Sequence, residues 1–246
     1  MSRVVIVSPH LDDAILSLGA SINAASRAGA YVVIVTVLAG DPTSRGAAGA
    51  WDAACGFSLC GEACESRRAE DARACSIVGA DPVWMPFGDN QYPRGGRDDE
   101  IRRRVADQVY GADLALVPGF PLSHDDHRWL AHLLQGDLGA HAVAEYLEQP
   151  YAALAGLQAN TEDGWEVASL PYISIGAKQR AASAYETQLR MLPAESLLAI
   201  RRAEAHSGGE AIRLRSGSRD QFESVASSLW PARARLVDAL AGYARD

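Results

Sequence analysis

Short apolar runs alternate with longer amphipathic segments over the first 140 residues of the chain. The apolar runs predict buried strands over residues 3–7, 31–38, 81–87 and 113–117. Between and after them, apolar residues recur at helical spacing and predict helices over residues 13–28, 62–79, 98–110 and 126–138. Strands that alternate regularly with helices are typical of a doubly wound, mostly parallel sheet, so we expect an α/β, Rossmann-like fold.

The pattern changes after residue 140. It predicts strands over residues 142–146, 166–175 and 210–214, the last an edge strand, and helices over 178–192, 193–205 and 220–243, with a kink or break at Trp230–Pro231. Residues 39–61 lack a clear period and predict a long loop beside the functional face. No linker divides the chain, so we expect one domain over residues 1–246 whose later segments wall a cleft.

The amino-acid composition of the chain narrows the classes of molecule that it is expected to bind. The 246 residues are 48% hydrophobic, as in ordinary globular proteins, and carry a formal net charge of −8. This negative charge disfavours nucleic acid and anionic membranes, since both require a basic surface. Neither a signal-like N-terminus nor an apolar run of about 18 residues is found, so we expect a cytoplasmic protein without a membrane segment. Homo-oligomers remain possible.

The four cysteines, Cys55, Cys60, Cys64 and Cys75, lie in one stretch. Their spacing does not match the paired C-x-x-C pattern of a structural zinc site. A disulfide is a second interpretation, but a cytosolic enzyme normally keeps cysteines reduced. The third, which we favour, is that they are free thiols that pack as small apolar groups.

Chemistry-bearing residues gather in the segment SPHLDDAILSLGA, residues 8–20, where the first strand hands over to the first helix. His10 and Asp13 are three residues apart and can converge on one ion from the first helical turn. Imidazole with carboxylate suits zinc or a similar divalent metal. Asp12 would then face a water bound there. Taken alone, Asp13 could equally be a helix cap.

A second cluster follows the strand predicted at 113–117. Residues 123–128 read SHDDHR and place His124 and His127 at another strand end, where ligands bind in open α/β sheets. Either histidine could complete the metal site. Asp126 would orient a histidine through its second ring nitrogen, and Asp125 would face solvent. Three further histidines have no acidic or histidine partner at ligand spacing and are expected at the surface or in packing: His132, His141 and His206.

The pairing of S-P-H-x-D-D with a later H-x-D-H resembles the PIG-L (LmbE-like) superfamily of metal-dependent N-deacetylases. The resemblance implies that zinc, or another divalent ion, is bound by His10, Asp13 and His127. It also implies that Asp12 is the general base and that His124 stabilises or protonates the transition state. Two departures are Leu11, where the family usually has proline, and Gly19-Ala20, where it usually has Gly-Gly.

Two residues outside these segments also match the family. The resemblance places Arg67, in an R-x-x-E match that ends at Glu70, at the substrate, although Arg68 is adjacent and the register could differ by one. It further suggests that Asp89 grips a sugar hydroxyl. Without the resemblance, Arg67 would be part of a solvated helix face and Asp89 a turn residue.

The activity implied is removal of an N-acetyl or other N-acyl group from an amino sugar, or from a natural product that contains one, releasing acetate and a free amine. A first alternative is a metal-dependent amidase or esterase for a non-sugar small molecule. A second is a non-enzymatic sugar- or nucleotide-binding module. The latter requires a glycine-rich phosphate turn after the first strand, and SPHLDD is not one.

Overall fold

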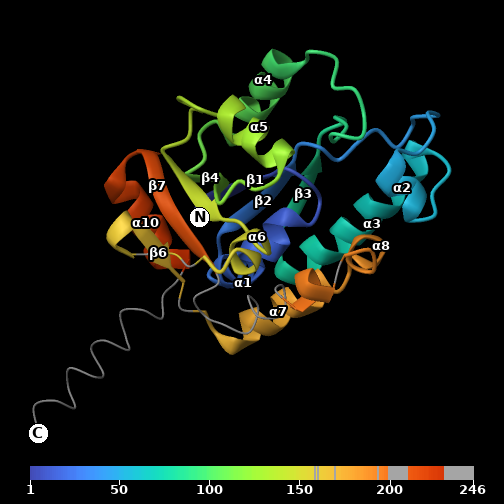
Figure 1. Cartoon of the computed structure of the whole chain (residues 1–246). Helices are drawn as coiled ribbons and strands as arrows, with labels where there is room; N and C mark the ends of the chain where they lie inside the picture. The colour runs from blue at the N-terminus through green and yellow to red at the C-terminus, as the bar shows by residue number, and fades with distance from the viewer. Residues whose placement is uncertain (158, 160, 169, 193, 199–209, 230–246) are drawn as a thin grey trace, which may run out of the picture.

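A seven-stranded sheet forms the centre of the computed structural model, which describes residues 1–157, 159, 161–168, 170–192, 194–198 and 210–229 (Figure 1). The strand order is β3-β2-β1-β4-β5-β7-β6. The first five strands are parallel, whereas β7 is antiparallel to β5 and β6 is antiparallel to β7. The strand bounds are β1 (Arg3–Ser8), β2 (Tyr31–Thr36), β3 (Asp81–Trp84), β4 (Leu114–Phe120), β5 (Ala142–Leu147), β6 (Trp165–Val167) and β7 (Ala211–Gly217).

Helices cover both faces of the sheet, as Figure 1 shows. One face packs against α1 (Asp13–Arg27), α3 (Cys60–Val78), α7 (Tyr172–Ala182) and α10 (Arg219–Leu229), and the other against α4 (Asp98–Val109) and α5 (Asp125–Leu133). Shorter helical segments are α2 (Ala50–Ala54), α6 (Tyr151–Leu154), α8 (Glu186–Leu189) and the 3-10 turn Thr161–Asp163. This arrangement confirms the predicted doubly wound α/β fold.

Strand β1 shows why its sequence is apolar without interruption. Val4 and Ile6 belong to the core cluster on the α1 face, and Val5 and Val7 belong to the cluster on the α4 face. Because successive side chains of a strand point to opposite faces, a strand covered on both sides must be apolar at every position. The helix that follows ends as predicted, since Gly29 adopts a φ of 90° just past α1.

The topology places a crevice at the ends of two neighbouring strands. The chain runs outward from β1 through β2 to β3, then returns to add β4 on the other side of β1. The connections after β1 and β4 therefore lead to opposite faces of the sheet, and their carboxyl ends form the topological switch point at which open α/β sheets bind ligands. His10 follows β1, and His124 follows β4.

Several predicted boundaries were wrong in the first part of the chain. The predicted loop over residues 39–61 contains α2, and α3 begins at Cys60. The strand predicted over residues 81–87 ends at Trp84, which pairs with the last residue of β2. The helix predicted over residues 126–138 spans Asp125–Leu133.

Larger corrections concern the later part. The strand predicted over residues 166–175 is only β6, and Pro171 starts α7 at a position where we expected extended chain. The helix predicted over 178–192 is divided into α7 and α8. Strand β7 is not an edge strand, because β6 covers it. Residues 194–198 are helical. Residues 199–209, with His206, and the predicted kink at Trp230–Pro231 lie outside the described residues.

The four cysteines are free, and Cys55, Cys60 and Cys75 are buried, which confirms the interpretation as packed thiols. None of the helices in the described ranges is long and apolar enough to cross a membrane. The single domain over residues 1–246 stays a prediction, since residues 230–246 lie outside the described part.

A buried ion pair connects the later segments to α1. Lys178 Nζ lies 2.7 Å from Glu210 Oε1, and both residues are 2% exposed. Glu210 also accepts hydrogen bonds from the backbone N–H groups of Ala20 (3.0 Å) and Ser21 (2.7 Å). The pair therefore holds α7 and the start of β7 against the middle of α1.

Replacing Lys178 by alanine should leave the Glu210 carboxylate buried without its counter-charge. We expect the free energy of unfolding to fall by about 3–5 kcal/mol, measured by urea denaturation followed by circular dichroism. The control is Arg219→Ala, which breaks an exposed pair with Glu223 and should cost less than about 1 kcal/mol. Equal losses in the two variants would contradict the structural role given to Lys178.

Candidate active site

The turn between β1 and α1 is held by its own polar groups. Ser8 Oγ donates to the carbonyl of His10 (2.6 Å) and accepts from the backbone N–H of Ala14 (3.1 Å). Leu11, at the position where the family usually has proline, is 5% exposed and packs into the core. The flanking residues His10 and Asp12 therefore stand in fixed positions at the end of the strand.

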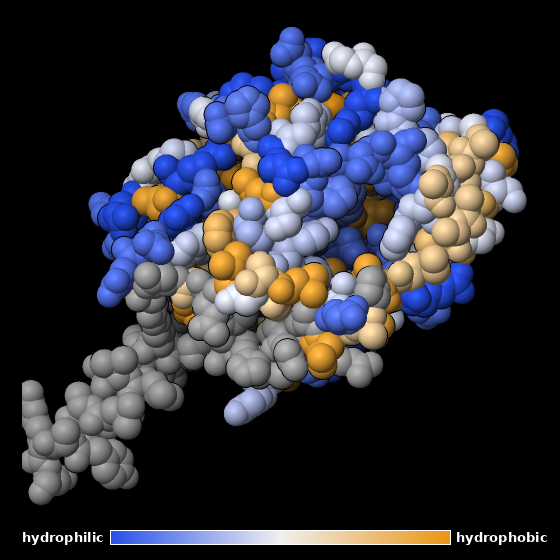
Figure 2. Space-filling view, viewed as in Figure 1, coloured by the Kyte–Doolittle hydropathy of each residue, from blue (hydrophilic) through white to orange (hydrophobic). Residues whose placement is uncertain are grey.

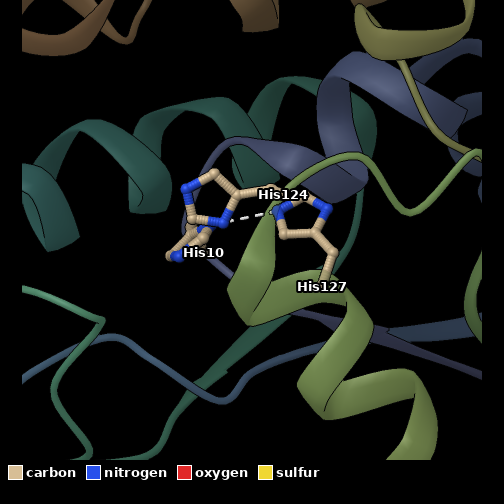
Figure 3. Close-up of side chains that lie close together, drawn as sticks. All are labelled: His10, His124 and His127. Carbon is tan, nitrogen blue, oxygen red and sulfur yellow. Dashed lines mark hydrogen bonds between the residues drawn. The ribbon is translucent and has the colours of Figure 1, made fainter.

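Three donor atoms from the two strand ends converge. Asp13 Oδ2 lies 3.1 Å from His10 Nδ1 and 3.1 Å from His127 Nε2, and the two ring nitrogens are 3.2 Å apart. Ligand atoms about 2.0–2.1 Å from a tetrahedral ion are about 3.3 Å apart. The spacing of the three atoms therefore fits one divalent metal ion. In Figure 3 a dashed line marks the close approach of the ring nitrogens of His10 and His127.

Each of the two histidines is held through its other ring nitrogen. Asp126 Oδ2 lies 3.0 Å from His10 Nε2, and Glu148 Oε1 lies 2.6 Å from His127 Nδ1. A carboxylate on one ring nitrogen fixes the tautomer that turns the lone pair of the other nitrogen toward a metal. In the structure, the histidine that Asp126 orients is therefore His10. Glu148, which directly follows β5, holds His127 in the same way. No role was predicted for Glu148 from the sequence, although it too follows a strand.

The charges of this cluster favour a cation. Burial lowers the pKa of His10, but hydrogen bonds to Asp126 and Asp13 outweigh it and raise the pKa to about 10. Burial is likewise outweighed at His127, where Asp13 and Glu148 raise the pKa to about 9. Burial raises the pKa of Asp13, but the two histidines hold it well below its usual range. The carboxylates of the cluster are therefore stabilised by positive charge nearby, which protons or a divalent ion can supply.

Asp12 and His124 line the pocket beside the three donor atoms. Asp12 is the N-cap residue of α1, yet its side chain makes no capping bond, and it lines the pocket. Burial, followed by the neighbouring Asp13, raises its pKa to about 6. His124 Nδ1 accepts the backbone N–H of Asp126 at 3.2 Å, so in the neutral ring the proton is on Nε2. Burial, followed by the charges of His10 and His127, lowers the pKa of His124.

His124 also lies close enough to be considered as a ligand. Among the described residues, His10, His124 and His127 form a group whose ring nitrogens lie within 4.8 Å of one another. His124 and His127 project from the same turn at the start of α5 (Figure 3). The backbone bond that Nδ1 accepts leaves the proton on Nε2 of the neutral His124 ring, which then offers a hydrogen-bond donor rather than a lone pair.

A pocket of about 370 Å³ opens over this cluster. Its floor contains His10, Asp12, Asp13 and His124. A mainly polar wall comes from α2, α3 and the turn after β3, with Trp51, Arg67, Asp89, Asn90 and Gln91. A more apolar wall includes Leu16, Pro150, Tyr151, Leu154 and Leu192. In Figure 2, apolar side chains gather on the surface around α6, which carries part of this second wall.

Arg67, not Arg68, reaches the pocket. The Arg67 side chain is almost fully buried, and its Nη1 lies 2.6 Å from Asp52 Oδ1. Its Nε has no hydrogen-bond partner among the described residues. Arg68 instead donates to the backbone carbonyls of Ala39 and Gly40. The register implied by the family resemblance is therefore compatible with the structure at Arg67.

The carboxylates of Asp89 and Glu70 accept hydrogen bonds from other residues of the protein. Both oxygens of Asp89, which lines the pocket, accept from Gln91: from its backbone N–H at 2.9 Å and from Nε2 at 3.0 Å. Glu70 accepts from the backbone and hydroxyl of Thr187 and so holds the start of α8. Neither partner could be found from spacing, because Thr187 is distant in sequence and Gln91 looked like an ordinary turn residue.

Comparisons with known proteins find deacetylases that are similar to this chain in sequence and in fold. Residues 5–135 match the sequence model of the PIG-L family, described as GlcNAc-PI de-N-acetylase. A search of curated proteins gives no significant match. A triple mutant of the teicoplanin-pathway deacetylase (Orf2*T) has a TM-score of 0.71 and 26% identity, over 89% of this chain and 100% of that chain. The A40926 pseudoaglycone deacetylase Dbv21 has a TM-score of 0.69 and 28% identity, over 87% and 96%.

The fold also occurs with another reaction. GalB, a 4-carboxy-2-hydroxymuconate hydratase from Pseudomonas putida KT2440, aligns with a TM-score of 0.55 and 19% identity, over 87% of this chain and 95% of that chain. The class of protein therefore has to be taken from the site and the sequence together. They define a hydrolase of the deacetylase class with a site that fits a divalent metal. The chain belongs to the PIG-L family.

Glu148→Gln tests the position given to Glu148. The change weakens the acceptor on His127 Nδ1, and outer carboxylates of this kind typically contribute about 10- to 100-fold to metal affinity. We expect a loss of that size, measured as the dissociation constant for Zn²⁺ in competition with a chelator. The control is Glu145→Gln, in β5, which pairs with Arg213 instead. It should leave the affinity for Zn²⁺ unchanged. An unaltered affinity in Glu148→Gln would contradict the role.

Proposed function

We propose that this protein is a divalent-metal-dependent N-deacetylase that hydrolyses the N-acetyl, or another N-acyl, amide of an amino sugar in a natural product. The products are acetate, or another acid, and a free amine. The observation that carries the proposal is the convergence of His10, Asp13 and His127 beside a carboxylate, Asp12, that makes no capping bond. Membership of the PIG-L family supports the same reaction.

In this proposal His10 Nδ1, Asp13 Oδ2 and His127 Nε2 bind zinc or another first-row divalent ion. When bound, such an ion polarises the amide carbonyl and lowers the pKa of water to about 7. Asp12 accepts a proton from the attacking water at its free carboxylate. His124 Nε2–H donates to the oxyanion that forms on the carbonyl oxygen. As the C–N bond breaks, the amine takes the proton that Asp12 accepted from the water, because a neutral His124 that gave up its one ring proton would become an imidazolate.

Arg67 and Asp89 are proposed as substrate contacts. Arg67 lines the pocket, where its ion pair with Asp52 holds the guanidinium in place. Because the Arg67 charge is already paired with Asp52, this position favours a neutral acceptor such as a hydroxyl or carbonyl over a phosphate. Asp89 is engaged by Gln91, but each carboxylate oxygen keeps a second lone pair for a sugar hydroxyl.

Substrate class and setting are inferred from the relatives and the sequence. Two relatives at 26% and 28% identity are deacetylases, one of the teicoplanin pathway and one for A40926 pseudoaglycone, so we propose a small-molecule natural product as substrate. The cytoplasmic location stays a prediction.

A metal-dependent amidase or esterase for a non-sugar molecule is the second candidate. The apolar pocket wall, with Leu16, Leu154 and Leu192, favours it, because such a wall could accept a longer acyl chain. Rates for N-acetyl amino sugars, longer N-acyl amino sugars and non-sugar N-acetyl amides discriminate the two. The sugar deacetylase should prefer the first set.

Asp12→Ala and Asp13→Ala separate base from ligand. Removing the base should lower turnover by at least about 100-fold while the metal content of the purified protein stays near that of the wild type. Asp13→Ala should lose the metal. Acetate release from an aryl N-acetylglucosaminide measures turnover, and elemental analysis measures the metal. If Asp12→Ala lost the metal instead, the roles of Asp12 and Asp13 would have to be exchanged.

A further inference from the structure

A tryptophan stands in the pocket wall on an element that cannot be stable alone. Trp51 belongs to α2, which has five residues, and the side chain lines the pocket while the residue remains 38% exposed. An isolated helix of one or two turns does not persist in water, because too few hydrogen bonds repay its nucleation. The position of the indole must therefore be set by contacts from other segments.

The first of these contacts comes from Gln91. Its side-chain Oε1 accepts the backbone N–H groups of Trp51 (2.8 Å) and Asp52 (3.2 Å), which lack partners within the short helix. Gln91 is in turn held by both oxygens of Asp89. A chain of hydrogen bonds thus runs from Asp89 through Gln91 to the backbone that carries Trp51.

The second contact comes through the next residue. Asp52 is 2% exposed and pairs with Arg67, while its other oxygen accepts the hydroxyl of Tyr92. Tyr92 also accepts the backbone N–H of Gly49, just before α2 (2.8 Å). The backbone on both sides of Trp51 is therefore held against α3 and the turn after β3, which keeps the indole at the pocket wall.

We propose that Trp51 is a binding platform for the apolar face of a sugar ring in the substrate, with Gln91 as the residue that positions it. A pyranose offers C–H groups on its face and hydroxyls at its edge. The platform matches this division, since the same wall carries the hydrogen-bonding groups of Arg67 and Asn90. This inference rests on the proposed deacetylase function and names the part of the pocket that would take the sugar.

The test uses the full-length, metal-loaded protein with an aryl N-acetylglucosaminide as substrate. Trp51→Ala should raise KM by about tenfold and leave kcat within about twofold. Gln91→Ala should change KM in the same direction by a smaller factor. Since Gln91 holds both Trp51 and Asp89, part of its effect should persist in the Trp51→Ala background, but the effects in the double variant should be less than additive. Tyr172→Ala is the matched control, an aromatic residue that is 93% exposed and outside the pocket lining, and should change neither constant.

Binding is checked without turnover. Adding glucosamine, the deacetylated sugar, should change the intrinsic fluorescence of the wild type but not that of Trp51→Phe, which keeps an aromatic surface. A KM unchanged in Trp51→Ala, or additive effects in the double variant, would overturn the platform. So would a fall in kcat with loss of metal, which would make α2 a support of the metal centre. If the wild type itself released no acetate from any N-acetyl amide, the proposed function would fail instead.

Discussion

The Asp13 carboxylate is the contact on which the site depends. One oxygen, Oδ2, lies close to both His10, in the turn before α1, and His127, in the first turn of α5, 114 positions further along the chain. These turns can meet because β1 and β4 are adjacent and parallel and their connections leave on opposite faces of the sheet. A different strand order would leave both histidine motifs intact in the sequence and separate them in space.

This contact requires negatively charged side chains to be buried. Asp13, Asp126 and Glu148 are all at most 5% exposed, and each is compensated by more than one group. Asp126 illustrates how: besides His10 it receives Arg94 at 2.7 Å and the backbone N–H of Asn90 at 3.1 Å. Arg94 in turn lies over the ring of Trp129, 4.2 Å from its centroid. Such shared compensation is what allows carboxylates to remain ionised inside the protein.

How far the sequence predicted this site follows from the range of each interaction. His10, Asp12 and Asp13 could be found because strand and helix periodicity located their turn, and His124 and His127 because they follow a second strand. Glu148, Asp52 and Gln91 could not, because their roles depend on side-chain pairs between segments whose packing no local pattern encodes. The same limit explains β6 and α7, where apolar residues near Pro171 favoured a strand until tertiary packing placed a helix there.

The floor and the walls of the pocket are built from different kinds of secondary structure. We therefore expect them to tolerate amino-acid substitutions to different degrees. The floor uses the ends of central strands, whose positions are fixed by cores on both faces. Much of the walls comes from α2, α6 and α8, which are four or five residues long and are held by a few side-chain bonds such as those of Gln91, Glu70 and Arg190. The longer helices α1 and α3 add Leu16 and Arg67. A substitution in a wall can therefore alter which substrate fits without moving His10 or Asp13. Because binding residues of a rigid scaffold commonly lie on segments that the sheet does not constrain, we expect the specificity of this pocket to depend on its walls more than on its floor.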